Sequence, residues 1–303
     1  MIRLGYACVN LSLGRKLRSL RLATLHTRGL PYLQQLVDEN MELLAQILRW
    51  NRMQQIGVFR ISSDLVPLGS HAEVDLKQLS FTRAQEIAEL AVGMRLSMHP
   101  GQYTLPSASG RVWESSYRDL CYHAFVLEQL GQTQGDILLH GGGVYGDRDS
   151  SARRICANIA SLPANVRHHL RLENDERCWS VHDLLPICEE TGTPLVVDSL
   201  HHQLNGREPL DALPWPRILA TWRRLRPKLH YAEQDPSKRP GAHSEYVSAA
   251  AFLEFRRQVP LEEYDVMLEC KAKDLALLKL RADLANLEPD VPGLDPFCAG
   301  QDR

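Results

Sequence analysis

Short apolar runs alternate along this chain with longer amphipathic stretches. Eight runs are rich in β-branched or other large apolar residues, and a loop and a helix-length segment follow each one. The expected strands are residues 2–7, 56–62, 94–99, 136–140, 169–174, 194–198, 227–231 and 265–270. From the second run onward their ends recur about every 34 residues, a normal length for a strand–helix unit.

The intervening stretches carry helix signals. Residues 32–50 place apolar side chains along one face at helical spacing. Thr82 with Gln85 forms a capping-box pattern before an apolar segment, and Ser180 with Asp183 is expected to start another helix. We expect the second of these helices to stop at a glycine, residue 192.

This alternation predicts the fold class. Strands that are apolar on both faces and alternate with helices indicate a parallel sheet. Eight such units without a change in composition predict an α/β protein built as one closed (β/α)8 TIM barrel, over residues 1–282. Residues 283–303, which are rich in Pro and Gly and lack periodicity, are expected to form a surface tail.

Composition narrows the class of protein. Apolar residues make up 44% of the chain, but no stretch approaches 18 in succession, and the first residues do not resemble a signal peptide. The seven cysteines form an odd set without CxxC spacing. They indicate reduced thiols rather than a disulfide framework. We therefore expect a cytoplasmic monomer that neither enters a membrane nor is secreted.

The formal charge of -2 conceals a basic start to the chain. Residues 1–37 contain no Asp or Glu, but they contain six cations: Arg3, Arg15, Lys16, Arg18, Arg21 and Arg28. A patch of this kind would suit a phosphate backbone, with Arg15, Lys16 and Arg18 as candidate DNA contacts. The alternative is a solvated loop whose charge acids elsewhere balance.

Polar residues occupy the ends of six predicted strands. TIM barrels place their catalytic groups at the carboxyl ends of the strands, where side chains from different strands converge. The residues at these ends, with one that follows shortly after, are His99, His140, Glu173, Asp198, His201, His230 and Glu269. One such His is usually structural, but six coincidences indicate a shared site.

The ligand types indicate a class of metal. Imidazole and carboxylate without thiolate suit Zn or Mn. Seven ligands exceed the need of one ion, and Glu173 could bridge two, so we expect two or three ions. A single structural Zn is disfavoured, because such sites close with four ligands that are usually near in sequence. Clustered divalent ions are a common device for hydrolysing phosphodiesters.

Several segments together resemble the UV damage endonuclease family. They occur in family-like order from about residue 2 to 280. The segments are GYACVN (5–10), FRISSDLVPLGSH (59–71), SMHPGQY (97–103), HGGGVYGD (140–147), LEND (172–175), VVDSLHH (196–202), PKLHY (227–231) and LECKAKD (268–274). The resemblance implies a fold like that of endonuclease IV and a manganese cluster. It also implies nicking of damaged double-stranded DNA on the 5′ side of UV photoproducts.

The resemblance also assigns residues. It implies that the metal ligands are His99, His140, Glu173, Asp198, His201, His230, His243 and Glu269. It further implies functional roles for Tyr6, Asn10, His71, Gln102, Tyr103 and Lys228. From the two sets together we expect Lys228, His71 and Glu173 to be catalytic. His71 would bind a metal or the scissile phosphate.

Lys228 lies two positions before His230 on one strand, so both side chains should face the metal site. Nearby cations should lower the pKa of its amine. A neutral amine could react with carbon dioxide to form a carbamate, and the family resemblance implies such a modified lysine. The alternative is an unmodified ammonium that contacts a phosphate.

Gln102 and Tyr103 follow His99 on a glycine-containing loop. Such a loop could enter the duplex and fill the space left by extruded bases, with Tyr6 supporting the flipped nucleotides from the opposite side. The alternative is an ordinary turn with Tyr103 packed on the barrel rim.

Together these features predict a metal-dependent endonuclease. The resemblance implies that it starts excision repair at cyclobutane dimers and 6-4 photoproducts, with abasic sites as a further candidate. Two other classes compete. A metal-dependent sugar isomerase uses the same barrel, but it needs no acid-free basic segment and normally has fewer His residues. A non-catalytic module that binds damaged DNA would have no need for seven metal ligands.

Overall fold

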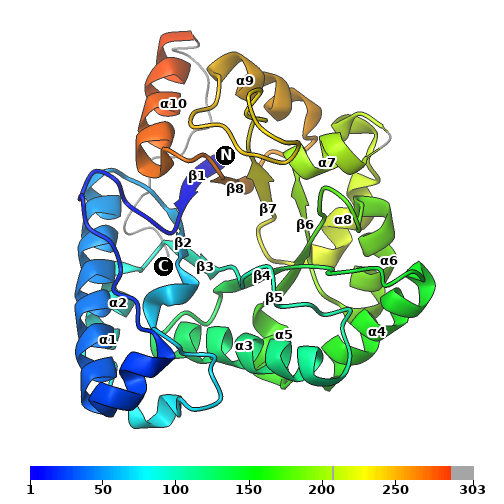
Figure 1. Ribbon diagram of the computed structural model, residues 1–303. Helices are drawn as coiled ribbons and strands as arrows, with labels where there is room; N and C mark the ends of the chain where they lie inside the picture. Colours follow the sequence, from blue (N-terminus) through cyan, green and yellow to red (C-terminus); the bar gives the residue numbers. More distant parts are fainter. Residues whose placement is uncertain (207, 288–303) are drawn as a thin grey trace.

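The computed structural model describes residues 1–206 and 208–287 as a closed barrel of eight parallel strands. Figure 1 shows the helices arranged around the strands. The strands are β1 (Ile2–Ala7), β2 (Val58–Ile61), β3 (Arg95–Met98), β4 (Asp136–His140), β5 (Leu170–Glu173), β6 (Leu195–Asp198), β7 (Lys228–Tyr231) and β8 (Tyr264–Leu268). Each strand pairs with the next, and β1 pairs with β8, which confirms the predicted TIM barrel.

The α-helices are α1 (Leu22–Met53), α2 (Ala84–Leu90), α3 (Gly110–Gln129), α4 (Arg148–Ser161), α5 (Ala164–His169), α6 (Val181–Thr191), α7 (Ser199–Asn205), α8 (Trp215–Trp222), α9 (Ala249–Gln258) and α10 (Lys273–Leu287). Short 3-10 helices occur at η1 (Ser63–Leu65), η2 (Leu76–Gln78) and η3 (Leu210–Ala212). Within the described residues, no helix has the length and apolarity that a membrane crossing would require.

The helix predicted to start at Ser180 is present, and its first residues form a capping box. Ser180 accepts a hydrogen bond from the Asp183 amide, and the Asp183 side chain accepts one from the Ser180 amide. This helix, α6, ends at Gly192, whose φ of 67° lies in the left-handed region that suits glycine. The Thr82 prediction is wrong, because α2 begins only at Ala84 and the Thr82 hydroxyl instead donates to Asp38.

Both ends of the chain differ from the expected boundaries. The basic segment contains strand β1 and is a loop only over residues 8–21, because α1 begins at Leu22 and runs through a kink at Gly29, where φ is 71°. Pro31 follows two residues later, and a proline lacks the amide hydrogen that a helix interior requires. At the other end, α10 continues to Leu287, five residues into the stretch expected to be a surface tail. The rest of that stretch, 288–303, lies outside the described residues.

Strand alternation divides the barrel interior into layers. Apolar side chains, including Val58, Leu138, Val196 and Met267, fill its middle. Below them lies a buried set of ion pairs, which we call the amino-end cluster: Arg3, Arg95, Asp136, Arg171, Arg226, Lys228 and Asp265. Above them lie the predicted metal ligands, at the carboxyl ends of the strands.

Candidate metal centre

The predicted ligands converge at the carboxyl end of the barrel. Three groups of residues each offer ligand atoms that lie within 4.8 Å of one another. They are His99, His140 and Glu173; Glu173, Asp198 and His201; and Glu173, His230 and Glu269. Glu173, the last residue of β5, belongs to all three groups. This geometry suits a cluster in which one carboxylate is shared between ions.

Individual distances define the centre of this site. His230 Nδ1 lies 2.8 Å from Glu173 Oε1 and 3.1 Å from Glu269 Oε1. His99 Nε2 lies 3.3 Å from Glu173 Oε2. The eighth predicted ligand, His243, follows β7 in a loop, and its Nδ1 lies 3.7 Å from Glu269 Oε2. The structure therefore brings all eight predicted ligands together.

The site contains buried polar atoms without protein partners. His140 Nδ1, Asp198 Oδ2 and His230 Nε2 have no hydrogen-bond partner among the described residues. Buried polar atoms are nearly always paired, because an unpaired one loses its hydration without replacement. Imidazole nitrogens and carboxylate oxygens are also ligands that Zn and Mn accept. These residues therefore fit a divalent metal cluster.

Backbone contacts hold the ligands in position. His99 Nδ1 lies 2.9 Å from the Pro100 carbonyl oxygen, and His201 Nδ1 lies 3.0 Å from that of Asn174. An imidazole that donates from Nδ1 to a carbonyl leaves the lone pair of Nε2 free for a metal. The Asn174 side chain also accepts from the Asp198 amide and donates to the Asp198 carbonyl, which ties β5 to β6.

The electrostatics of the site favour cations. Burial opposes ionisation of Glu173 and Glu269, but neighbouring positive groups outweigh it and hold the pKa of both carboxyls well below the usual range. Burial also lowers the pKa of His230, yet Glu173 and Glu269 raise it to about 9. The site thus holds anionic carboxylates against the His230 imidazole, which has a high proton affinity. A divalent metal would replace that proton.

Arg60 is a site residue that the sequence analysis missed. Its Nη1 donates to Glu269 Oε1 at 2.5 Å, and its side chain is only 11% exposed. Burial lowers the pKa of this guanidinium, but Glu269 and other neighbouring groups together outweigh burial and raise it above its ordinary value. The available signal was a charged residue inside an otherwise apolar strand. Arg60 thus fixes the position of one predicted metal ligand, Glu269.

The structure corrects the expected placement of Tyr6 and Asn10. Both are buried, and the Tyr6 hydroxyl donates to Asn51 at 2.7 Å and accepts from Asn10 at 2.8 Å. Tyr6 packs against Trp50 and Phe59, on the outer face of β1 under α1. The reason is alternation, since Ala7 packs with barrel-interior residues and its neighbour Tyr6 must therefore face outward. In this structure neither side chain reaches the mouth of the barrel.

The loop after β3 lies in the open. Gln102 is exposed, and the Tyr103 side chain is 80% exposed. A pocket of about 180 Å³ opens beside the predicted ligands His99 and His140, and Gln102 lines it. His71, by contrast, has no contact with the predicted ligands within the described residues. Its Nδ1 accepts from the Glu73 amide at 3.2 Å.

The six early cations do not form one patch. Arg15, Lys16 and Arg18 are exposed on the loop after β1, at the end of the barrel that carries the metal ligands. Arg15 donates to Gln46, and Arg18 lies 3.3 Å from Glu39. Arg3 lies at the opposite end, because it precedes the loop by a whole strand and pairs with Asp265.

Lys228 faces the barrel interior, as its spacing from His230 predicts, but its ammonium contacts a different layer. Nζ lies 2.8 Å from Asp136 Oδ2, and both side chains are fully buried. Burial lowers the pKa of this amine to about 8, although Asp136 opposes the effect. Lys228 therefore links the amino-end cluster to the strand that carries His230.

Comparisons with known proteins agree with this geometry. The family model described as UV-endonuclease UvdE matches residues 2–293. A UV DNA damage endonuclease from Bacillus thuringiensis is 32% identical over 267 residues, which cover 84% of each chain. The crystal structure of SacUVDE superposes with a TM-score of 0.85 at 34% identity and covers 95% of this chain and 99% of its own.

A more distant structure shares the fold alone. Endonuclease IV from Thermus thermophilus gives a TM-score of 0.57 at 18% identity over 81% of this chain and 94% of its own. The agreement with the UvdE family model, by contrast, extends across the barrel and includes every strand end that carries a predicted ligand. This chain therefore belongs to the UV-endonuclease UvdE family.

Proposed function

We propose that this protein is a metal-dependent endonuclease that cuts damaged double-stranded DNA on the 5′ side of UV photoproducts. The substrates would be cyclobutane dimers and 6-4 photoproducts, with abasic sites as a further candidate. One observation carries the proposal: three groups of possible ligands share Glu173 at the mouth of a barrel from the UvdE family. A cleaved phosphodiester needs both its attacking and its leaving oxygen stabilised, and clustered ions meet this need.

The metal would be Mn²⁺, with Zn²⁺ as the alternative, in a cluster of two or three ions. When bound, the cluster would supply Lewis acidity and an activated water. His99 and His140 would hold one side of it, and Asp198 and His201 another, with Glu173 between them. Arg60 would keep Glu269 oriented, while His71 would contact the phosphate after a movement of its loop.

Lesion recognition would be indirect. Photoproducts weaken stacking and pairing, so extruding them costs less than the few kcal/mol needed for intact pairs. The exposed ring of Tyr103 would stack in the vacated space, and the Gln102 amide would meet the orphaned bases. Arg15, Lys16 and Arg18 stand on the same end of the barrel, where they would contact backbone phosphates.

Lys228 would carry a carbamate. The Nζ–carbon bond would form as the amine adds to carbon dioxide and releases a proton. The supporting observation is charge: five cations of the amino-end cluster surround only two carboxylates. A carbamate would make this four cations against three anions. Intact mass under non-acidic conditions would reveal the added carboxyl group, and a plain amine in protein with every metal position filled would contradict it.

A gel assay on plasmid tests the proposed function. Irradiated supercoiled plasmid should be nicked with Mn²⁺ and remain supercoiled after exhaustive chelation, while unirradiated plasmid should stay intact in both cases. Nicking that survives chelation would contradict metal dependence. Equal nicking of irradiated and unirradiated plasmid would contradict damage specificity. We also expect a cytoplasmic, monomeric enzyme, and light scattering of the purified protein tests its oligomeric state.

A further inference from the structure

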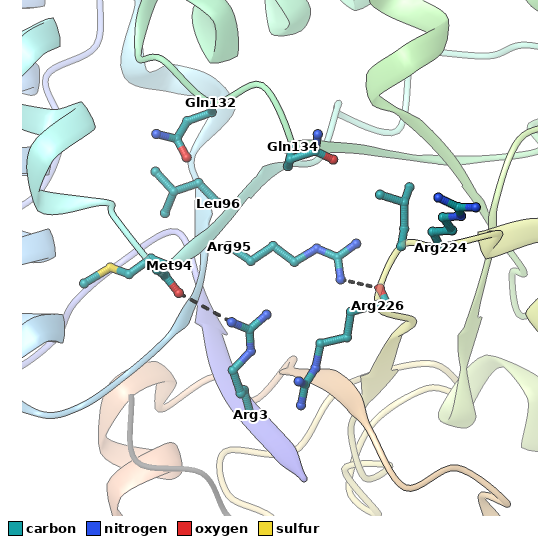
Figure 2. Close-up of a pocket in the computed structure, with 10 residues that line it drawn as sticks. Arg3, Met94, Arg95, Leu96, Gln132, Gln134, Arg224 and Arg226 are labelled. Carbon is teal, nitrogen blue, oxygen red and sulfur yellow. Dashed lines mark hydrogen bonds between the residues drawn. The ribbon is translucent and has the colours of Figure 1, made fainter. Parts of the chain in front are cut away.

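A second pocket lies at the opposite end of the barrel from the metal ligands. Its volume is about 300 Å³, and Figure 2 shows how basic side chains surround it. Four arginines and two glutamines line it, together with apolar and backbone groups: Arg3, Arg95, Arg224, Arg226, Gln132 and Gln134. No acidic side chain is among its lining residues in the described part of the chain.

The arginines of this pocket have too few anions to balance them. One carboxylate, Asp265, serves three of them: Arg3 Nε at 2.8 Å, Arg95 Nη1 at 3.0 Å and Arg226 Nε at 3.0 Å. An exposed acid, Glu263, lies 3.8 Å from Arg226 Nη1, and its side chain is 64% exposed. The pocket therefore keeps a net positive charge in a half-buried setting.

The second buried carboxylate does not change this balance. Asp136 already pairs with Arg95 at 2.8 Å and with Arg171 at 3.0 Å, and Lys228 lies 2.8 Å away. Lys228 does not line the pocket, so the charge of the lining residues is independent of the state of that amine.

Two lining residues have free donors. Arg224 and Gln134 are exposed, and neither forms a hydrogen bond or ion pair with any residue that the structure describes. Arg95 and Asp136 form a buried ion pair that can stabilise the amino end of the barrel. Arg224 is exposed and takes no part in that ion pair. Gln134 lies in the loop that enters β4 and Arg224 in the loop that enters β7. These strands are not adjacent in the barrel, so the two residues line the pocket from separate loops.

We propose that this pocket binds a phosphate group, either as the free anion or on a small molecule such as a nucleoside monophosphate. Planar guanidinium groups match the oxygens of phosphate, and charge-assisted hydrogen bonds are about twice as strong as neutral ones. Arg3, Arg226 and Arg224 supply such donors, and the Gln134 amide adds a neutral one. The volume of the pocket suits a small molecule. The site is separate from the metal centre and does not depend on the proposed endonuclease activity.

Calorimetric titration of the metal-loaded protein with inorganic phosphate and with adenosine 5′-monophosphate, at constant ionic strength, tests the proposal. Arg224→Ala should weaken binding of the phosphate group about tenfold. It should leave the melting temperature without phosphate and the nicking of irradiated plasmid unchanged. Arg111→Ala, at an exposed position on α3, is the matched control and should bind as the wild type does.

Phosphate could also bind at the metal centre, so the same titrations are repeated after chelation. Binding that persists in chelated protein and responds to Arg224→Ala supports the pocket. Tighter binding of the nucleotide than of phosphate identifies a nucleotide as the ligand class, and equal binding identifies the phosphate group alone. Binding that disappears on chelation, or that is the same in Arg224→Ala and wild type, overturns the proposal.

Discussion

The two ends of this barrel are built from the same strands, yet their charged residues are treated in opposite ways. Strand β5 contributes Arg171 to the amino end and Glu173 to the carboxyl end, and β7 contributes Lys228 and His230 in the same order. At the amino end the cations pair with buried carboxylates. At the carboxyl end several ligand atoms have no partner among the described residues. The paired charges at the amino end indicate a role in stability, and the unpaired ligand atoms at the carboxyl end indicate a functional site.

The strongest test of this contrast removes the shared ligand. Glu173→Gln keeps the size of the side chain but loses the carboxylate common to all three ligand groups. We expect nicking of irradiated plasmid to fall roughly 10³-fold, with little change in the urea midpoint, because the site lies at the rim. Glu189→Gln, on the exposed face of α6, is the control and should retain wild-type activity. A large loss of stability with Glu173→Gln would show that the carboxyl end is also structural.

The converse test is made at the amino end. Asp265→Asn would leave Arg3, Arg95 and Arg226 without their shared carboxylate, so we expect unfolding free energy to fall by about 3 kcal/mol. Urea denaturation measures this change. Metal content per folded molecule should stay the same, and a loss of metal at full stability would show that the two ends are coupled.

Protonation of Asp265 should also make the folding stability fall at acid pH. Burial alone raises the pKa of Asp265, but the hydrogen bond from Arg3 and the charges of Arg95 and Arg226 lower it below its ordinary value. Its contribution is therefore complete above the unfolded-state value of about 3.9 and is lost as the pH falls through the lower folded value. Urea midpoints of the wild type should decline below pH 4. Asp265→Asn should show a shallower decline, and parallel curves would assign the acid sensitivity to other carboxyls.

At the carboxyl end, recognition of damaged DNA can be tested separately from metal binding. Replacing Gln102 and Tyr103 together by Ala should lower the ratio of affinities for damaged and undamaged duplex about tenfold, since stacking on one aromatic ring contributes about 1–3 kcal/mol. Metal content should not change, because neither residue belongs to the predicted ligand set. The ratio is measured at one fixed salt concentration. A variant with the wild-type ratio would place the probe of damaged DNA elsewhere on the mouth.

The smallest expected effect concerns the basic loop after β1. Neutralising Arg15, Lys16 and Arg18 together should flatten the dependence of log affinity on log salt by roughly 0.9 for each phosphate that the loop no longer neutralises. Arg239→Ala removes one exposed cation outside this loop, and it shows how far the loss of any single surface charge changes the slope. An unchanged slope would mean that this loop does not touch DNA, although it lies at the end with the metal ligands.

Much of this molecule was predictable from local patterns. Apolar runs that alternate with amphipathic stretches predicted the eight strands, because a parallel sheet buried on both faces requires them. The same strands predicted the site, since the carboxyl ends of barrel strands meet at one mouth. His99, His140, Glu173 and Asp198 could be assigned to it without knowing a single distance.

Only the tertiary structure decided which way individual side chains face and what they meet. From the sequence, Tyr6 is expected to lie at the mouth of the barrel. Side-chain alternation along β1 instead points it outward, under α1. Arg3 shares a basic segment with Arg15, yet the length of one strand carries them to opposite ends of the barrel. Only β6 separates β5 from β7, and the curvature of the sheet turns the interior side chains of both strands toward each other, which is why Glu173 meets His230 from 57 residues away. Sequence patterns record the face and the end of each strand, whereas contacts across the barrel depend on its closure and register.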